Sequence, residues 1–284
     1  MKSYFKIIIL LLSAVCVTLF VSPIIADITD FHLYKIMSRV VLISVLVLFL
    51  NYKYRFGFQS IKDLGLEFNA KWWKLVLLGF VLGIISIGII LLIMLSNSIR
   101  FIVSDISYLG WIRNIIQYLF AGFLIAFFEE LIFRGFIFQS LLKDSGMVGP
   151  VFFTNILYSI VHFMKPSSLD YISVLSLFSS IDALPKFFSP VILNFTNIWP
   201  SLVGLFLVGA VLSAAYLRTK SLALPIGLHA GWVMAIKSIS ITTDSTTSGI
   251  FWMSGNVVEN PITWFVLIIL FFLIRWSGVS FLRK

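Results

Sequence analysis

The sequence predicts an all-α, polytopic membrane protein with about eight transmembrane helices. Three observations predict this class: 60% of the 284 residues are apolar, only 12% are charged, and the mean hydropathy is +1.06. A soluble domain usually carries about 25% charged residues. Intrinsic disorder would need low hydrophobicity and high charge, and a disulfide framework would need more cysteines than Cys16 alone.

Eight apolar stretches are candidates for membrane-spanning helices. They lie near residues 5–25, 36–52, 72–95, 111–140, 148–165, 199–217, 221–240 and 261–276. The first also resembles a signal peptide, because Lys2 and Lys6 precede an apolar core. Its length and the spans that follow favour an uncleaved helix, so we treat residues 1–284 as a single integral membrane domain.

The distribution of basic residues predicts the orientation of this domain. If the loops alternate across the membrane, one side carries 14 Lys and Arg residues and the other carries 7. Basic loops tend to stay in the cytoplasm, so we expect both termini there and the protein in the plasma membrane. The net charge of +9 has the same explanation. No basic run with interleaved aromatic residues lies outside the spans, so we expect no nucleic-acid partner.

The connection over residues 166–198 is long and fairly apolar, and Pro166, Pro185 and Pro190 are expected to break its secondary structure. One interpretation is an amphipathic piece that lies on the outer surface of the membrane. The alternative is a cap or re-entrant segment over a site in the helix bundle.

The fourth span contains three ionisable residues in the run AFFEELIFRGFIF. Such groups are costly inside a membrane and are functional candidates. Glu130 and Arg134 are four residues apart, so they can pair on one helix face. Glu129 is rotated by about 100° and needs a partner on another helix. The structural alternatives are a simple ion pair for Glu130 and Arg134, and a protonated, hydrogen-bonded carboxyl for Glu129.

Two of the three histidines, His162 and His229, lie inside other predicted spans, whereas His32 lies in a polar connection and should be solvated. Counted from the nearest turns at ~1.5 Å per residue, Glu129 and His162 lie ~18–21 Å deep and His229 ~13 Å deep. These depths are near the middle of a hydrocarbon core ~30 Å thick. Gly227 and Gly231 flank His229 and allow close helix packing. We therefore expect the three side chains to face one cavity.

One carboxylate and two imidazoles suit hydrolysis in two ways. Glu129, His162 and His229 can hold a divalent metal ion, with zinc as the first candidate, and leave a position open for water. Alternatively, Glu129 removes a proton from water directly, while the histidines polarise the carbonyl and protonate the leaving amine. The residue types do not choose between the two.

The motifs resemble the CAAX protease and bacteriocin-processing (CPBP, or Abi) family of intramembrane endopeptidases. The pattern of this family is EExxxR, then FxxxH, then HxxxN or HxxxD, on an eight-helix membrane fold. EELIFR matches the first motif, and YSIVH, which ends at His162, matches the second with Tyr158 in place of Phe. HAGWV matches only the histidine of the third, because Val233 stands where the family has Asn or Asp. The resemblance covers residues 110–240, the expected catalytic core.

This resemblance implies a type II CAAX prenyl protease-like peptidase, of metallo- or glutamic type. Its partners would be a membrane-associated, prenylated or precursor protein or peptide and the lipid bilayer itself. By resemblance, Glu129 would activate water, His162 and His229 would complete the site, and Glu130 and Arg134 would support it. Asn155, two turns before His162, is a candidate to replace the missing Asn of the third motif.

Two other functions compete with the peptidase. The first is a non-catalytic bacteriocin immunity or scaffold protein that keeps the same fold. The second is a proton-coupled transporter in which Glu129 acts as a relay. A transporter of this kind should show internal symmetry with broken helices in both halves, whereas the polar residues of this chain cluster in one half.

Overall fold

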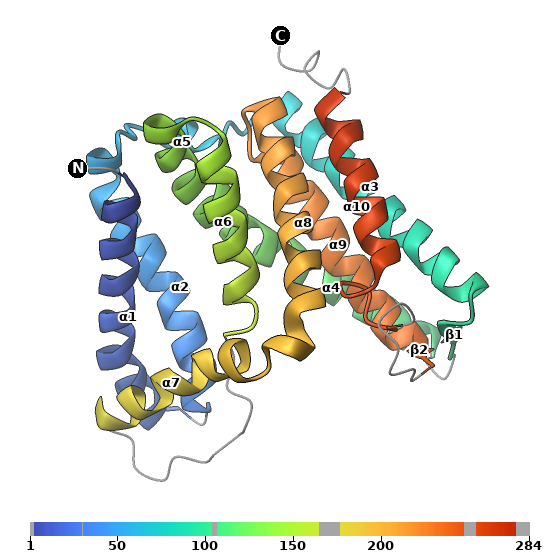
Figure 1. The fold of residues 1–284 in the computed structure, drawn as a ribbon, viewed down its shortest axis with the longest axis horizontal. Coiled ribbons are helices and arrows are strands. Elements are labelled where there is room, and N and C mark those ends of the chain that lie inside the picture. Colours follow the sequence, from blue (N-terminus) through green and yellow to red (C-terminus); the bar gives the residue numbers. More distant parts are fainter. Residues whose placement is uncertain (1–2, 30, 104–106, 165–176, 247–253, 277–284) are drawn as a thin grey trace. The chain divides into compact units, whose positions relative to one another are not determined.

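The computed structural model describes residues 3–29, 31–103, 107–164, 177–246 and 254–276, and most of them are helical (Figure 1). The helices are α1 (Ser3–Asp27), α2 (Leu33–Tyr52), α3 (Ala70–Ser96), α4 (Tyr108–Glu130), α5 (Gln139–Ser145), α6 (Val148–Val161), α7 (Leu177–Leu193), α8 (Phe195–Thr219), α9 (Ala223–Thr242) and α10 (Pro261–Trp276). This confirms the all-α membrane class.

Within the described residues, six helices are long and apolar enough to cross a membrane, and they make the chain an integral membrane protein. They coincide with six of the predicted spans. The other two predicted spans, 148–165 and 261–276, are the shorter apolar helices α6, with 14 residues, and α10, with 16 residues. At ~1.5 Å per residue, α6 is ~21 Å long and α10 ~24 Å long, less than a hydrocarbon core of ~30 Å.

The chain divides into two compact units. The first comprises Met1–Gln59 and Phe136–Trp199, and the second comprises Ser60–Gly135 and Pro200–Lys284. Residues Glu129, Glu130, Arg134 and His229 therefore belong to the second unit, whereas His162 belongs to the first.

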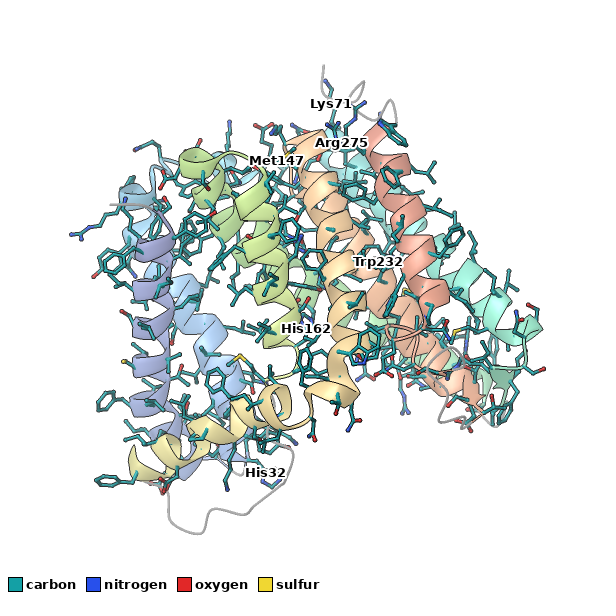
Figure 2. The ribbon with its side chains drawn as sticks, in the orientation of Figure 1. His32, Lys71, Met147, His162, Trp232 and Arg275 are labelled. Atoms are coloured by element: carbon teal, nitrogen blue, oxygen red, sulfur yellow. The ribbon has the colours of Figure 1, made fainter. Side chains whose placement is uncertain are left out.

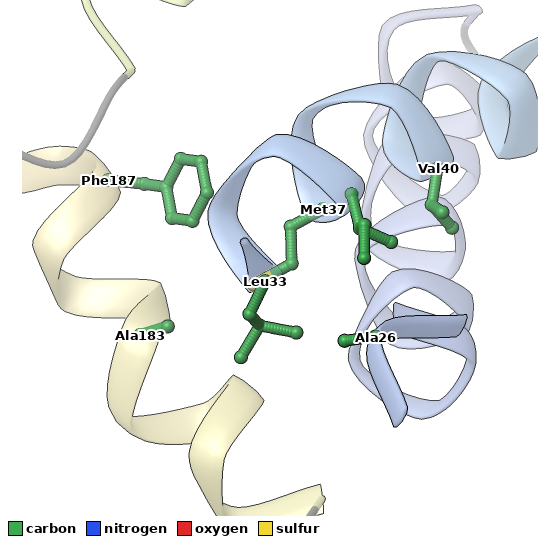
Figure 3. Close-up of a cluster of buried hydrophobic side chains, with 7 residues drawn as sticks. Ala26, Leu33, Met37, Val40, Ala183 and Phe187 are labelled. Carbon is green, nitrogen blue, oxygen red and sulfur yellow. The ribbon is translucent and has the colours of Figure 1, made fainter. Parts of the chain in front are cut away.

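In the first unit, α7 packs against the adjoining ends of α1 and α2 (Figure 3). The buried cluster consists of Ala26, Leu33, Ile36, Met37 and Val40 from α1 and α2, with Ala183 and Phe187 from α7. The opposite side of α7 leaves Phe178, Ile181 and Ile192 exposed. Part of segment 166–198 is thus a helix with one packed and one exposed face, and its place on the membrane surface or over the site stays a prediction; residues 165–176 lie outside the described residues.

The expectation that Pro185 and Pro190 break this connection is wrong, because both lie inside α7. A proline removes one backbone N–H and leaves the carbonyl four residues earlier without its usual donor. For Pro190 that carbonyl belongs to Lys186, and the Ser189 hydroxyl donates a hydrogen bond to it at 2.9 Å. The hydroxyl thus replaces the missing donor.

In the second unit, α3 and α9 cross at the distance of backbone contact. A Cβ atom added at Gly83 would lie 2.6 Å from the Leu228 carbonyl oxygen, and one added at Gly231 would lie 2.5 Å from the Phe80 carbonyl oxygen. Only glycine permits this approach, as the small residues around His229 predicted. Beside the crossing, Trp232, labelled in Figure 2, donates its indole N–H to the Ser86 hydroxyl at 2.9 Å.

Two short antiparallel strands, β1 (Arg100–Ile102) and β2 (Thr243–Ser245), follow the C-terminal ends of α3 and α9. Arg100 pairs with Ser245 in the register, and its guanidinium donates to the carbonyl oxygens of Thr243 at 2.7 Å and Gly255 at 2.6 Å. These bonds fix the ends of the two helices relative to each other. A strand of three residues is too short to show a recognisable alternation of apolar and polar residues, so the sequence did not predict this pair.

Candidate active site

The glutamate pair lies where the helix changes its winding. The α-helix α4 ends at Glu130 and continues as a π-helix over Leu131–Phe138 before α5 begins. Every residue from Glu130 to Phe138 is buried. π-helices are rare, occur mostly as single turns, and are frequent at functional sites. The predicted span 111–140 contains this change, but hydropathy alone does not reveal it.

Glu130 and Arg134 form the ion pair that their spacing predicted. Nη1 of Arg134 donates to Oε1 of Glu130 at 3.0 Å, and both side chains have 0% exposure. Nη2 of Arg134 donates to the carbonyl oxygen of Gly209 on α8 at 3.2 Å. The guanidinium therefore links the glutamate to a second helix.

The same glutamate oxygen also holds His229. Nδ1 of His229 lies 2.9 Å from Oε1 of Glu130. Because this oxygen already accepts a hydrogen bond from Arg134, Nδ1 of His229 is the donor of their contact. The contact fixes the orientation of the ring, and in the tautomer with the proton on Nδ1 it leaves Nε2 free of that contact, on the side of Glu129. Sequence reasoning assigned Glu130 to Arg134 alone, since no local spacing relates residues 130 and 229.

Glu129 faces His229 on α9. The sequence predicted that Glu129 would need a partner on another helix, and α9 provides it. Its Oε2 lies 3.9 Å from Nε2 of His229, with the two side chains 21% and 6% exposed. The distance is too long for a direct hydrogen bond. The ring of His229 is thus located between two carboxylates, bonded to Glu130 on one side and facing Glu129 on the other.

His162, in the first unit, lies at the end of α6 (Figure 2). The predicted span 148–165 is longer than the observed helix, and His162 is the C-terminal capping residue of α6. Its Nδ1 lies 2.7 Å from the Tyr158 carbonyl oxygen. Because a carbonyl can only accept, Nδ1 of His162 is the donor of this contact. The amides of Phe163 and Met164 bond to carbonyls three residues earlier and close the last turn.

Three further residues were singled out from the sequence. Asn155 is fully buried in α6, and Val233 is half-buried one turn after His229 in α9. A valine side chain cannot donate a hydrogen bond, so the amide of the family pattern is missing at this position. His32 is exposed before α2 and stacks on Tyr34 with ring centroids 5.8 Å apart, as expected for a solvated residue.

The metal hypothesis concerns Glu129, His162 and His229. Among the residues that the structure describes, no group of three or more His, Cys, Asp and Glu side chains lies together in a way that would hold a metal ion. Both histidines nevertheless have the second-sphere contact of a typical ligand, an Nδ1–H group bonded to a carboxylate or a carbonyl. The donor chemistry of the residues fits a metal, and the three-residue ligand set stays a prediction.

Comparison with known proteins supports the motif analysis. Residues 111–235 match the model of the Rce1-like family, described as type II CAAX prenyl endopeptidase Rce1-like. No curated protein and no solved structure matches the chain. The matched region contains EELIFR, YSIVH and HAGWV, and it lies within the predicted core 110–240. Residues 111–235 are therefore similar to the Rce1-like type II CAAX prenyl endopeptidases, as the three motifs predicted.

Proposed function

We propose that this protein is an intramembrane endopeptidase that hydrolyses a peptide bond of a membrane-associated protein or peptide, either prenylated or a precursor. One observation carries the proposal: Oε2 of Glu129 and Nε2 of His229 face each other at 3.9 Å. Around this pair, Glu130 and Arg134 form a fully buried support. The family match over residues 111–235 gives independent support for peptidase activity.

The facing pair suits the binding of a water molecule. A Glu129 carboxylate and an Nδ1-protonated His229 both present acceptor atoms, which cannot bond to each other. A water molecule can donate one O–H group to each. As the water oxygen forms a bond to the scissile carbonyl carbon, a water proton passes to Glu129. Glu129 then gives this proton to the nitrogen of the leaving amine as the C–N bond breaks, and the carboxylate is restored. Glu129 is thus proposed as the general base.

The buried ion pair of Glu130 and Arg134 holds the His229 ring in this orientation. Arg134 balances the charge of Glu130, and Glu130 orients the ring of His229 toward Glu129. A preorganised site of this kind need not rearrange when charge develops in the transition state. We assign Glu130 and Arg134 to positioning. His162 and Asn155 are proposed to polarise the carbonyl, since Val233 cannot provide the hydrogen bond expected at its position.

The proposal has two forms, which differ in the participation of a metal. In the first, Glu129 acts on water directly. In the second, Glu129, His162 and His229 would hold a divalent ion such as zinc, which would supply Lewis acidity toward water or the carbonyl. In both forms the protein residues orient the reacting groups and exclude bulk water. We also propose that the site acts at the plasma membrane, with both termini in the cytoplasm.

A cleavage assay with the full chain in liposomes tests the activity. The substrates are quenched fluorescent peptides anchored in the bilayer, one ending in a prenylated cysteine followed by three residues and one anchored by an apolar helix. We expect the wild type to cleave at least one of them. Glu129→Gln should lose about 10²–10⁴-fold in rate, the range for loss of a general base. Glu67→Gln, the same change at an exposed position, should match the wild type. A folded wild type that cleaves neither peptide would favour the immunity or scaffold function.

Elemental analysis and chelation decide between the two forms. The metal form predicts roughly one zinc ion per chain, loss of activity with a chelator, and loss of the ion in a His162→Ala/His229→Ala variant. The direct form predicts full activity in metal-free protein. A bound ion that survives in the double variant would rule out the proposed ligand set.

A further inference from the structure

The segment that follows α2 alternates aromatic and basic residues. Its sequence from Tyr52 to Phe58 is YKYRFGF, which we call the aromatic–basic turn. Lys53–Phe56 forms a single 3₁₀ turn, and Gly57 ends it in the left-handed region with φ of 74°. The turn lies at the end of the candidate membrane span Leu33–Phe56. The end of a candidate span is where a membrane surface is expected.

Two lysines outside the turn hold its backbone in place. Nζ of Lys6 donates to the Arg55 carbonyl oxygen at 2.7 Å. Nζ of Lys143 donates to the carbonyl oxygens of Phe56 at 3.2 Å and Gly57 at 3.0 Å, and it lies 3.7 Å from the centroid of the Phe58 ring. These two ammonium groups fix the conformation of the turn.

The two basic residues of the turn itself have a different environment. Nζ of Lys53 lies 5.1 Å from the Tyr54 ring centroid, and Cζ of Arg55 lies 5.4 Å from the Tyr52 ring centroid. The tyrosines are 61% and 47% exposed, respectively. In the part of the chain that the structure describes, neither cation forms an ion pair with a carboxylate. Both are backed by aromatic rings and open to a ligand.

The charge around the turn is strongly positive. Within the described part of the first unit, four cations, Lys6, Lys53, Arg55 and Lys143, lie at this end of the helices with one carboxylate, Asp144, which accepts a hydrogen bond from the Ser3 amide. At the opposite end of α1 and α2, the charges are mixed, since Lys35, Arg39 and Lys186 accompany Asp27 and Asp182. Positive charge therefore concentrates at one end of the first unit.

We propose that the aromatic–basic turn binds the head group of an anionic phospholipid. Lys and Arg near a membrane surface each contribute attraction to acidic lipids, and arginine can donate two parallel hydrogen bonds to a phosphate. Exposed tyrosines are favoured at the level of the head groups, where they anchor the turn. Lys53 and Arg55 would contact the phosphate, while Lys6 and Lys143 hold the backbone. The proposal is independent of peptidase activity.

A lipid-retention experiment tests this site. The full chain is reconstituted in nanodiscs of phosphatidylcholine mixed with phosphatidylglycerol, then extracted in mild detergent, and the retained lipids are quantified by mass spectrometry. The test variant is Lys53→Gln/Arg55→Gln. The matched control is Lys35→Gln/Arg39→Gln, which removes the same charge from the other end of α2. The control cations also lie over aromatic rings, at 6.0 Å from Tyr34 and 5.9 Å from Phe31.

We expect the wild type and the control to retain phosphatidylglycerol in excess of its share of the bilayer. In the test variant, the enrichment of phosphatidylglycerol over its share of the bilayer should fall by about tenfold, consistent with the attraction of two cations at a membrane surface. Added salt should weaken the preference of the wild type, because exposed charges are screened. Unchanged melting temperatures would show that the variants are folded. A test variant with wild-type retention, or a control that loses as much as the test variant, would overturn the proposal.

Discussion

Helix α9 has two faces that are built in opposite ways. Toward α3, it presents Gly227 and Gly231, and the two backbones approach so closely that no side chain fits between them. Toward α4, it presents His229, which contacts a fully buried ion pair. The first face depends on close approach of the two backbones. The second combines one such approach, at Gly122, with a buried pair of opposite charges.

The difference explains how one helix can hold the His229 ring at a fixed position. A glycine contact positions the helix by steric fit, without any polar group that could compete with the site. A buried ion pair contributes little to stability by itself, but removal of one partner is strongly destabilising. We infer that the α3 face sets the location of α9 and the α4 face sets the orientation of the His229 ring. Substitutions on the two faces should therefore destabilise the protein for different reasons, steric on the α3 face and electrostatic on the α4 face.

The largest loss of stability is expected for Glu130→Gln. The change leaves the Arg134 charge without its counter-ion in a fully buried location and weakens the bond to His229. Breaking one partner of a buried pair costs about 3–5 kcal/mol. The free energy of unfolding, measured in detergent by chemical denaturation, should fall by this amount.

A double variant separates charge from packing on this face. Glu130→Gln/Arg134→Met removes both charges and should recover part of the lost stability. If the double variant is no more stable than Glu130→Gln, the loss comes from packing and not from the stranded charge.

A smaller loss is expected on the glycine face. In Gly83→Ala, the added Cβ meets the Leu228 carbonyl oxygen at 2.6 Å, so the backbones must separate. Overpacking of this kind costs about 1–3 kcal/mol. Gly88→Ala on the same helix is the matched control, because a Cβ there meets nothing within 4 Å. The melting temperature should fall for the first and stay or rise for the second; equal effects would contradict the steric account of this face.

The smallest effect is expected for Ser86→Ala. This change removes the acceptor of the Trp232 N–H group beside the glycine crossing. Loss of one buried hydrogen bond costs about 1 kcal/mol. Thermal denaturation should show a modest decrease, and cleavage by the folded protein should be unchanged. A loss of activity without a loss of stability would mean that this contact, too, orients the site.

The sequence predicts much of this architecture, and the failures have clear causes. Hydropathy located the helices, and the four-residue spacing predicted the contact between Glu130 and Arg134. The bond between Glu130 and His229 joins positions 99 apart, so no local pattern reports it. The π-helix also leaves no signal of its winding, because its residues apart from Arg134 and Gly135 are as apolar as those of an ordinary span. Pro185 and Pro190 were expected to break the secondary structure of their connection. At Pro190 the hydroxyl of Ser189 replaces the missing donor, and this bond is visible only in the folded structure.

The most direct test of the account compares the two adjacent glutamates. Glu129→Gln and Glu130→Gln are purified, their melting temperatures are measured, and cleavage of the anchored peptides is expressed per folded molecule. The account predicts that Glu129→Gln melts like the wild type and has no measurable turnover, because the amide keeps the shape but cannot accept a proton as a base. Glu130→Gln should melt at a lower temperature. An active Glu129→Gln beside a stable and inactive Glu130→Gln would contradict the assignment of the two roles.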